Sequence, residues 1–345
     1  MTMAPVEVGA ALAAALGRDG APGEVRALQR LTGGATKQTW SFDWVRGDRS
    51  EPLILQQTPV ASPTPAASPA ASAAPTLRAP KLSAEHDAAL MIVARAGGVP
   101  APVVRRVLAP EDGLGSAYVT ERVEGETLGR RIVEHPDFAA ARPLMARQCG
   151  EILAHIHQLP TADLGFLATL SPADELSVYG GLLAQFELRH PALAYALRWV
   201  REHLPTHWET RVVHSDFRTG NLIVGADGVR CVLDWEIARL GDPMQDLGVL
   251  CMRTWRFGGA GEAGGFGSRE DLYAAYERTA GVPVDPERVR FWEAFSNFKW
   301  AISCVRRGLA KRADGTPASV ELCAVGRRLE EPLWDFFSLI EGTSS

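Results

Sequence analysis

One polar segment in the second half of the chain, residues 214–236, constrains the fold more than any other part of the sequence. It reads HSDFRTGNLIVGADGVRCVLDWE, and its apolar runs predict short strands joined by a GADG hairpin turn. Asp216, Asn221 and Asp234 lie at strand ends or in the loop between strands, where their side chains can converge. Two carboxylates and an amide oxygen are the hard ligands that Mg²⁺ prefers. The segment therefore predicts a magnesium nucleotide site.

The spacing of these three residues indicates phosphoryl transfer. That reaction asks a protein to position the reactants and to neutralise charge, with a carboxylate that orients or deprotonates the attacking hydroxyl. In the catalytic loop of eukaryotic-like kinases, an Asp is followed five residues later by a metal-binding Asn and, after a hairpin, by a metal-binding Asp. Asp216 is therefore the expected base, and Asn221 and Asp234 are the expected metal ligands.

The first part of the chain, up to about residue 124, has the pattern of a small antiparallel sheet with one helix. The helix is expected at 83–97, with Ser83 as its N-cap and the Gly97–Gly98 pair as its end. Residues 58–80 are almost entirely Pro, Ala and Ser, which cannot anchor to a core, so we expect an exposed, mobile connector there. Strands are expected at 25–31, 37–45, 52–57, 102–109 and 117–123.

The second part, residues 125–345, is mostly helical in its apolar spacing. Its glycine-rich stretch at 257–268 predicts either a plain linker or a mobile rim over an acceptor site. Together the two parts predict an α+β chain with two lobes, an N-terminal nucleotide-binding lobe and a C-terminal catalytic and substrate lobe. Helices are expected at 141–159, 191–204, 242–255, 270–281, 286–309 and 320–340.

Charge and cysteine content exclude several classes of partner. A net charge of -5 and a pI near 6.0 leave no basic surplus for a nucleic-acid backbone or an anionic membrane surface. The five cysteines show no CxxC spacing, which favours a reducing compartment. The N-terminal residues resemble a short amphipathic helix more than a signal peptide, and no apolar run approaches the roughly 20 residues of a membrane span. We therefore expect a soluble, cytoplasmic protein.

The motifs HSDFRTGN and VLDWEIARLGDPMQDLG resemble those of the aminoglycoside phosphotransferase family, whose pattern is H-G-D, four residues, N, then a hydrophobic-D motif. Within that family, the LDWE…GDPxxDLG stretch is most similar to phosphotransferases related to the kinase-like domain fused to some acyl-CoA dehydrogenases. The resemblance covers nearly the whole chain, from LTGGATKQTW through YVTERVEG to the last helices. It implies a bilobal protein-kinase-like fold that binds ATP or GTP in the cleft, with Mg²⁺ bridging the phosphates.

The resemblance also implies roles for residues of the first lobe. A glycine loop would cover the phosphates, Thr120 would face the base, and a hinge would hydrogen-bond the adenine edge. Glu85 sits where the family's ion-pairing glutamate belongs, and Asp246 of the second lobe resembles the buried aspartate that braces the catalytic loop. The loop residues would be Gly33, Gly34 and Thr36, and the hinge groups the Glu121 carbonyl and the Val123 amide.

The third strand departs from the family pattern. There the family carries a lysine or arginine that holds the α and β phosphates, whereas this chain reads LILQQT, with Gln56 or Gln57 in that place. A neutral amide donates hydrogen bonds but supplies no charge, and charge-assisted contacts are roughly twice as strong. Arg218, two residues after the expected base, is a candidate for the charge on the transferred phosphate. Lys37 and Lys81 could also reach inward.

The resulting hypothesis is a phosphotransferase that moves the γ-phosphoryl group of ATP or GTP to a hydroxyl of a small molecule, with Mg²⁺ as cofactor. A metabolite or a hydroxyacyl compound is the expected acceptor. Two alternatives remain open. The missing cation favours a non-catalytic nucleotide-binding pseudokinase, and the family favours an aminoglycoside-resistance kinase. The sequence decides neither the acceptor, nor ATP against GTP, nor the oligomeric state.

Overall fold

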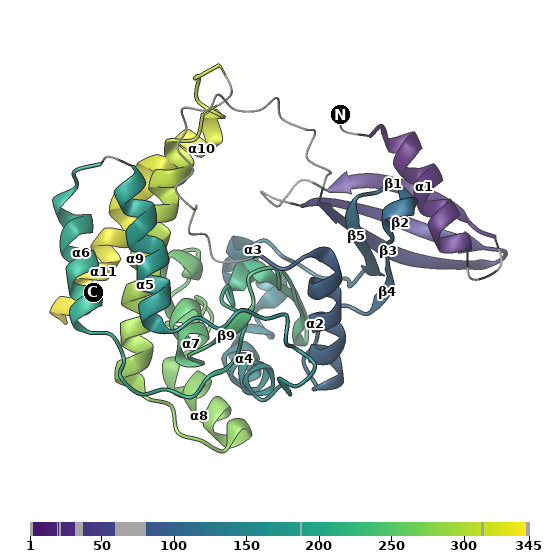
Figure 1. Cartoon of the computed structure of the whole chain (residues 1–345). Coiled ribbons are helices and arrows are strands. Elements are labelled where there is room, and N and C mark those ends of the chain that lie inside the picture. Colours follow the sequence, from purple (N-terminus) through teal and green to yellow (C-terminus); the bar gives the residue numbers. More distant parts are fainter. Residues whose placement is uncertain are drawn as a thin grey trace. The chain divides into compact units, whose positions relative to one another are not determined.

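The computed structural model (Figure 1) describes residues 3–18, 20, 22–31, 37–58, 81–186, 188–311 and 314–342. Of the predicted connector, residues 59–80 lie outside this described part. The chain divides into two compact units. The first contains the residues up to Glu124 together with Cys231–Glu236, and the second contains Gly125–Arg230 and the residues from Ile237 onward. Within the described residues, no helix combines the length and the apolar character that crossing a bilayer requires.

The first unit is built on a five-stranded sheet in the order β1-β2-β3-β5-β4, with every pair antiparallel. A two-residue turn joins β2 to β3, and its first residue, Gly47, has a φ of 56°. Glycine adopts this conformation without strain, as a type II′ turn requires. The sheet confirms the predicted antiparallel arrangement. Its strands are β1 (Glu24–Leu31), β2 (Gln38–Arg46), β3 (Arg49–Thr58), β4 (Val104–Val107) and β5 (Ser116–Glu121).

Helix α1 (Pro5–Gly17) and one face of this sheet form a single apolar cluster. Val8 and Leu12 of α1 are completely buried in it. Side chains of a strand alternate between the two faces, so Gln56 and Thr39, which pair across the ladder, lie on the face opposite to the cluster. The strand residues in the cluster are Trp40, Phe42, Trp44, Leu53 and Leu55.

Helix α2 (Ala84–Ala96) begins and ends as its sequence predicts. The Ser83 hydroxyl oxygen accepts a hydrogen bond from the His86 N–H at 3.2 Å, which is the expected N-cap, and the chain turns at Gly98 with a φ of 87°. Residues 231–236 are tied to the same unit. The Val232 N–H donates to the Pro100 carbonyl at 2.7 Å, and the Leu82 N–H donates to the Glu236 carbonyl at 2.8 Å.

The second unit is mostly helical, which confirms the predicted α+β class. Its helices are α3 (Gly129–Glu134), α4 (Arg142–His157), α5 (Pro172–Gln185), α6 (Pro191–Glu202), α7 (Met244–Cys251), α8 (Arg269–Ala280), α9 (Pro286–Gly308), α10 (Val320–Gly326) and α11 (Glu330–Glu341). Two small sheets pair β6 (Arg211–Val213) with β9 (Arg239–Gly241) and β7 (Leu222–Gly225) with β8 (Gly228–Val232). Its short 3-10 turns are η2 (Pro136–Phe138), η3 (Thr219–Asn221), η4 (Arg253–Arg256) and η5 (Arg327–Leu329), while η1 (Pro110–Asp112) belongs to the first unit.

The last predicted helix, 320–340, is divided in the structure into α10 and α11. The division begins at Gly326, where the backbone lies against Gly308 at the end of α9. A Cβ atom on Gly326 would lie 2.4 Å from the Gly308 Cα, so this approach admits only glycine. The predicted helix 242–255 likewise ends early, at Cys251, and continues as the turn η4. Helix α5 was not predicted by the sequence patterns.

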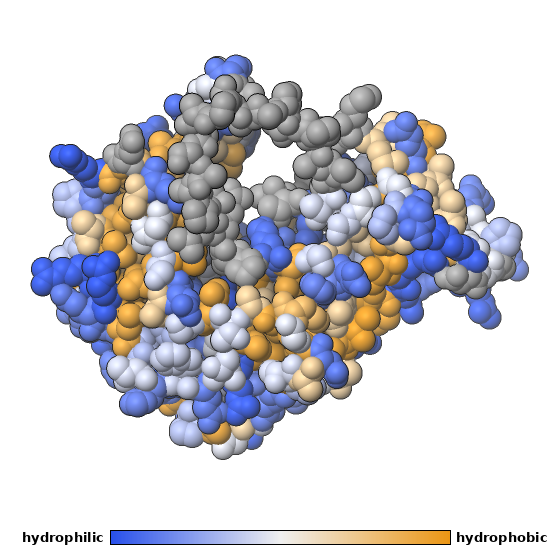
Figure 2. All heavy atoms as spheres, viewed as in Figure 1, coloured by the Kyte–Doolittle hydropathy of each residue, from blue (hydrophilic) through white to orange (hydrophobic). Residues whose placement is uncertain are grey.

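Figure 2 shows hydrophilic and hydrophobic residues interspersed over the face that it presents. The exposed large apolar side chains of the described residues include Val6, Val320 and Trp334, which are 83%, 81% and 69% exposed and belong to three different helices. Apolar side chains scattered in this way are usual on protein surfaces. The exposed apolar side chains therefore do not mark a binding site, and the polar clusters of the chain are the better guide to it.

Candidate active site

The chain leaves strand β6 through His214 and Ser215 and reaches Asp216 in a strained turn. Ser215 has a φ of 72°, a left-handed conformation that costs a non-glycine residue of order 1 kcal/mol or more. Asp246 of helix α7 stabilises the turn, because its two carboxylate oxygens accept the N–H groups of His214 and Ser215, each at 2.7 Å. Asp246 thus fixes the backbone of the two residues that directly precede Asp216.

Asp246 is completely buried and remains a carboxylate. Burial alone would raise the pKa of Asp246, but the hydrogen bond and charge of His157, together with the charge and backbone N–H of His214, hold it below its ordinary value. His157 Nε2 lies 3.2 Å from Asp246 Oδ2, and its Nδ1 lies 2.9 Å from the Tyr276 hydroxyl. The structure therefore gives Asp246 the bracing position that the resemblance implied.

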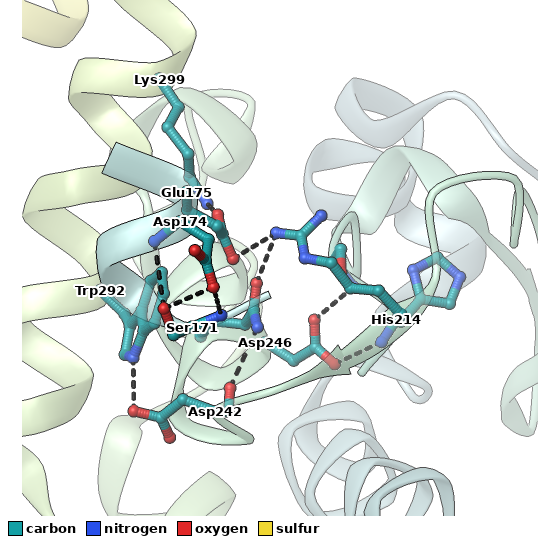
Figure 3. Close-up of polar contacts among 11 residues, drawn as sticks. Ser171, Asp174, Glu175, His214, Asp242, Asp246, Trp292 and Lys299 are labelled. Atoms are coloured by element: carbon teal, nitrogen blue, oxygen red, sulfur yellow. Dashed lines mark hydrogen bonds and ion pairs between the residues drawn. The ribbon is translucent and has the colours of Figure 1, made fainter. Parts of the chain in front are cut away.

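Figure 3 shows how the segment that carries Asp246 is itself fixed. Asp242, four residues before Asp246, accepts a hydrogen bond from Trp292 Nε1 of helix α9 at 2.7 Å. Arg239, three residues further back, is 2.6 Å from a carboxylate oxygen of Glu175 on α5, whose second oxygen accepts from Lys299 of α9 at 3.0 Å. Buried charges persist only when they are paired in this way. These contacts connect α5, α7 and α9 beneath the loop.

Asp216 is held by two side chains from its own loop. Asn221 Nδ2 donates to Asp216 Oδ2 at 2.7 Å, and Arg218 Nε donates to Oδ1 at 3.0 Å. The Asp216 side chain is nevertheless 26% exposed, so a substrate can reach it. Because both contacts of the Asn221 side chain use its nitrogen, its Oδ1 points elsewhere and is open to another partner. The structure thus brings Arg218 and Asn221 to Asp216.

Arg218 stacks on an aromatic side chain from the neighbouring turn η4. Its guanidinium carbon lies 4.4 Å from the centroid of the Trp255 ring, which in turn lies 5.1 Å from the Trp300 ring. Arg307 lies over the Trp300 ring at 5.4 Å. We call these four residues the Arg–Trp array. It begins at the candidate base and carries two positive charges held by cation–π contacts.

The glycine-rich stretch at 257–268 is folded against the rest of the second unit, so it is not a plain linker. Gly264 and Gly265 are buried, with φ of 59° and 86°, and a Cβ on Gly265 would lie 2.2 Å from the Arg256 carbonyl oxygen. The Thr219 hydroxyl donates to the Gly264 carbonyl at 2.8 Å. The stretch therefore packs against the loop of Asp216 as a part of its support, and glycine is needed because the backbones approach so closely.

A second polar cluster lies within the first unit, on the face of the sheet that carries Gln56. Lys37, directly before β2, places its Nζ 2.5 Å from Asp87 Oδ2 of helix α2 and 3.5 Å from Glu236 Oε2. The Tyr118 hydroxyl of β5 donates to Asp87 at 2.8 Å and contacts Gln56 Oε1. Of the two glutamines in β3, it is thus Gln56 that faces this cluster, while Gln57 points to the α1 side.

The ion pair of helix α2 is formed two residues further along the helix than expected. Glu85 is exposed, and the acid that pairs with a lysine is Asp87, whose side chain is only 1% exposed. Asp87 shares the buried face of α2 with Ala84, Ala88 and Met91. A helical projection of residues 84–94 separates this face from Glu85 and could have identified Asp87.

The remaining predicted residues lie in several places. Glu121 ends β5, and Val123 follows it in an extended segment whose N–H makes no hydrogen bond to any described residue. Asp234 is exposed with a φ of 64°, a strained conformation for a non-glycine residue, and its charge helps to raise the pKa of Lys37. The glycine-loop residues Gly33, Gly34 and Thr36 lie outside the described part of the chain.

The donor atoms fit a hard cation. Among the described residues, no group of three or more His, Cys, Asp or Glu side chains forms a ready metal cage. Mg²⁺ does not need one, because it keeps several waters and binds through one or two protein oxygens plus phosphate. The Asn221 Oδ1, which neither side-chain hydrogen bond of Asn221 uses, and the exposed carboxylate of Asp234 are oxygens of that kind.

The sequence matches the model of one protein family, described as the phosphotransferase enzyme family, over residues 27–292. This span is more than half of the chain and contains both polar clusters.

Solved structures of similar fold belong to phosphotransferases. One, from Ralstonia eutropha JMP134, is assigned to the aminoglycoside phosphotransferases; it covers 96% of this chain and 98% of its own, with a TM-score of 0.69 and 20% identity. A choline/ethanolamine kinase family protein from Mesorhizobium loti covers 91% and 88%, with a TM-score of 0.60 and 19% identity. The ADP-bound aminoglycoside phosphotransferase APH(2'')-Ib gives a TM-score of 0.57 at 13% identity and covers 91% and 94%. These likenesses establish the fold.

Two curated relatives are much longer proteins. Acyl-CoA dehydrogenase family member 10 of Mus musculus is 30% identical over 162 residues, which are 42% of this chain and 15% of the relative. Acyl-CoA dehydrogenase family member 11 of Homo sapiens is 31% identical over 122 residues, 32% of this chain and 16% of the relative. The chain thus matches about one sixth of the length of these relatives, in line with the resemblance noted from the LDWE…GDPxxDLG stretch.

Proposed function

The chain belongs to the phosphotransferase enzyme family, and from that premise we propose that it moves the γ-phosphoryl group of ATP or GTP to a hydroxyl group of a small molecule. The observation that carries the proposal is the state of Asp216. It is a partly exposed carboxylate, oriented by Asn221 and Arg218, on a strained turn braced by a buried Asp246.

Asp216 accepts the proton of the attacking hydroxyl, since a carboxylate within hydrogen-bond reach of the nucleophile is what this step requires. Arg218, already beside Asp216, offsets negative charge that develops on the transferring group. Asn221 Oδ1 and the Asp234 carboxylate are the oxygens that would hold Mg²⁺, and the ion would neutralise charge on the phosphates. The strain at Ser215 keeps Asp216 in place before the substrate arrives.

The first unit binds the nucleotide in this proposal. The Val123 N–H, which has no partner among the described residues, and the Glu121 carbonyl hydrogen-bond the adenine edge, with Thr120 facing the base. Gly33, Gly34 and Thr36 form the loop over the phosphates, and Gln56 contributes hydrogen bonding but no charge. Glu85 is exposed, and the acid of α2 that pairs with a lysine is Asp87.

The acceptor is a metabolite or a hydroxyacyl compound rather than an aminoglycoside. The side chains that extend from Asp216 in the second unit are the Arg–Trp array, which offers indole faces and two guanidinium groups. A polycationic aminoglycoside needs an acidic surface instead, because like charges repel. The array favours an acceptor that carries an apolar or a negatively charged part beside its hydroxyl.

A phosphorylation screen tests the proposal. The whole chain is first titrated with Mg-ATP and Mg-GTP in a thermal-shift assay, and then incubated with γ-labelled nucleotide and pools of hydroxylated metabolites, hydroxyacyl compounds and aminoglycosides. We expect nucleotide binding, transfer to one non-aminoglycoside pool, and no transfer by Asp216→Asn. Binding without transfer to any pool would support the pseudokinase instead, and transfer to aminoglycosides alone would support a resistance kinase.

A further inference from the structure

The face of the sheet that carries Gln56 also carries a lysine from the neighbouring strand. Lys37 directly precedes β2, and the ladder pairs Gln38 with Gln57 and Thr39 with Gln56. Residues 37, 39 and 41 alternate with the buried Trp40 and Phe42, so Lys37 shares the face of Thr39. An ammonium group therefore comes from the second strand, next to the position where the third strand has a neutral amide.

Two carboxylates hold this ammonium. Lys37 Nζ lies 2.5 Å from Asp87 and 3.5 Å from Glu236, and its side chain is only 11% exposed. Burial lowers the pKa of Lys37, but the charge and hydrogen bond of Asp87 and the charge of Glu236 raise it above its ordinary value. Lys37 is therefore a fixed positive charge at neutral pH.

The second carboxylate does not depend on Lys37 alone. Glu236 Oε1 contacts Lys81, whose side chain is half exposed, while its Oε2 faces Lys37. If Lys37 turns toward an anion, Glu236 keeps a cationic partner, and Asp87 keeps its hydrogen bond from Tyr118. Lys37 can thus turn its ammonium group toward a new anionic ligand while both buried carboxylates keep another partner.

From this geometry we infer that Lys37 is the residue that holds the nucleotide phosphates, in place of the cation absent from β3, and that Asp87 orients it. The inference rests on the proposed function and deepens it. Three features of the first unit support it. In the sequence Lys37 directly follows LTGGAT, its Nζ lies 3.5 Å from Glu236, two residues along the chain from the candidate magnesium ligand Asp234, and Gln56 is engaged by Tyr118. A polyanionic phosphate chain beside Mg²⁺ is the ligand that such an ammonium recognises.

Relocating the lysine tests the inference. We expect Lys37→Met to weaken Mg-ATP binding about 10- to 100-fold, the effect of losing one charge-assisted contact. Binding of adenosine, which has no phosphate, should stay within about twofold of the wild type, because the hinge is unchanged. Adding Gln56→Lys to Lys37→Met should restore most of the Mg-ATP affinity by returning a cation to the third strand. Isothermal titration calorimetry of the whole chain measures all three.

Further variants separate phosphate binding from folding. Lys37→Met leaves Asp87 without its ion pair, so the double variant Lys37→Met/Asp87→Asn removes both charges and should regain thermal stability while Mg-ATP binding stays weak. Lys37→Arg should bind Mg-ATP close to the wild-type level. Lys311→Met, the same change at an exposed lysine of the second unit, should change nothing.

The outcomes are distinct. Wild-type affinity for Mg-ATP in Lys37→Met, or an equal loss of Mg-ATP and adenosine binding in Lys37→Met/Asp87→Asn, would overturn the inference but leave the proposed function standing. Failure of Gln56→Lys to restore any affinity would overturn it as well. A wild-type chain that binds neither Mg-ATP nor Mg-GTP would end both the inference and the proposed function.

Discussion

The side-chain amide of Asn221 donates two hydrogen bonds to Asp216, one to carboxylate Oδ2 at 2.7 Å and one to the backbone oxygen at 2.9 Å. One side chain thus fixes both the direction of the candidate base and the loop on which it stands. Because both bonds use the amide nitrogen, the amide oxygen is left for another partner. In the proposed function, Asn221 thus serves both the base and the metal ion.

Asn221→Ala should lower the rate of phosphoryl transfer about 10- to 100-fold, because Asp216 loses a charge-assisted hydrogen bond and the proposed metal site loses an oxygen ligand. Asn221→Asp should not restore the rate, since a carboxylate cannot donate to Asp216 and repels it. Single-turnover transfer with labelled ATP is the measurement. Gln158→Ala is the control, because Gln158 also donates a side-chain amide hydrogen bond to a backbone carbonyl, that of Ala280, away from Asp216. A similar loss in the control would speak against a special role for Asn221.

Asp216→Asn should lower turnover about 10²- to 10⁴-fold, the usual contribution of a general base. The amide nearly preserves the shape of the side chain, so the affinity for Mg-ATP should change by no more than a few-fold. Steady-state transfer and nucleotide titration separate the two quantities. Asp227→Asn, in the exposed turn between β7 and β8, provides a matched control. Unchanged turnover in Asp216→Asn would remove the assignment of the base.

The contacts within the Asp216 loop were predictable because they are local. Asp216 and Asn221 are five residues apart within one turn, and a short loop between two strands leaves few ways for them not to meet. The two strands, the cap at Ser83 and the sheet of the first unit follow from equally short-range patterns. Where the sequence sets the local geometry, prediction and structure agree.

The contacts that were missed join residues far apart in the chain. Lys37 meets Asp87 fifty residues later and Glu236 at much greater separation, so no local spacing announces the cluster. Gly326 divides the last helix because of Gly308 on another helix. In both cases a tertiary contact decides what the local pattern leaves undetermined. The one available signal was the buried face of α2, because of the two acids in the first turn of that helix only Asp87 is buried.

Acid should destabilise the chain through Asp246 and Glu175. Burial raises the pKa of both carboxyl groups, but hydrogen bonds and opposite charges lower it by more than burial raises it. The pKa of Asp246 is therefore below its ordinary value of 3.8, and that of Glu175 is below 4.5. A carboxyl group whose pKa is lower in the folded state stabilises the fold above its unfolded-state pKa, and this contribution is lost as the pH falls through the folded-state pKa. The free energy of unfolding, measured in urea, should therefore fall steeply below about pH 4.

Replacement of Asp246 makes that expectation specific. Asp246→Asn should cost about 1–3 kcal/mol at pH 7, because one of the N–H groups of His214 and Ser215 loses its acceptor. The variant should also show a shallower decline below pH 4, since one titrating group is gone. The exposed Asp163→Asn should follow the wild-type curve at every pH. Parallel curves for Asp246→Asn and the wild type would show that Asp246 does not carry the linkage.

Two glycine-to-alanine changes in helices should act in opposite directions. In α7, a Cβ on Gly248 would lie 2.7 Å from the Glu293 backbone nitrogen of α9, an atom that cannot move without shifting the helix. Gly248→Ala should therefore destabilise the fold by about 1–3 kcal/mol through overpacking. In α5, a Cβ on Gly180 would meet only Leu197 Cδ1 at 3.5 Å, an ordinary contact. Gly180→Ala should stabilise the fold by about 0.5–1 kcal/mol, because alanine loses less backbone entropy in a helix.

Urea unfolding of both glycine variants, followed by far-UV circular dichroism, measures the two shifts against the wild type. The opposite signs make the comparison decisive, because a general effect of the added methyl group would move both midpoints in the same direction. Equal stability of Gly248→Ala and the wild type would mean that α7 and α9 can separate slightly at no cost. Since α7 carries Asp246 and α9 carries Trp292, which bonds to Asp242 in front of α7, the support beneath Asp216 would then be looser than the contacts imply.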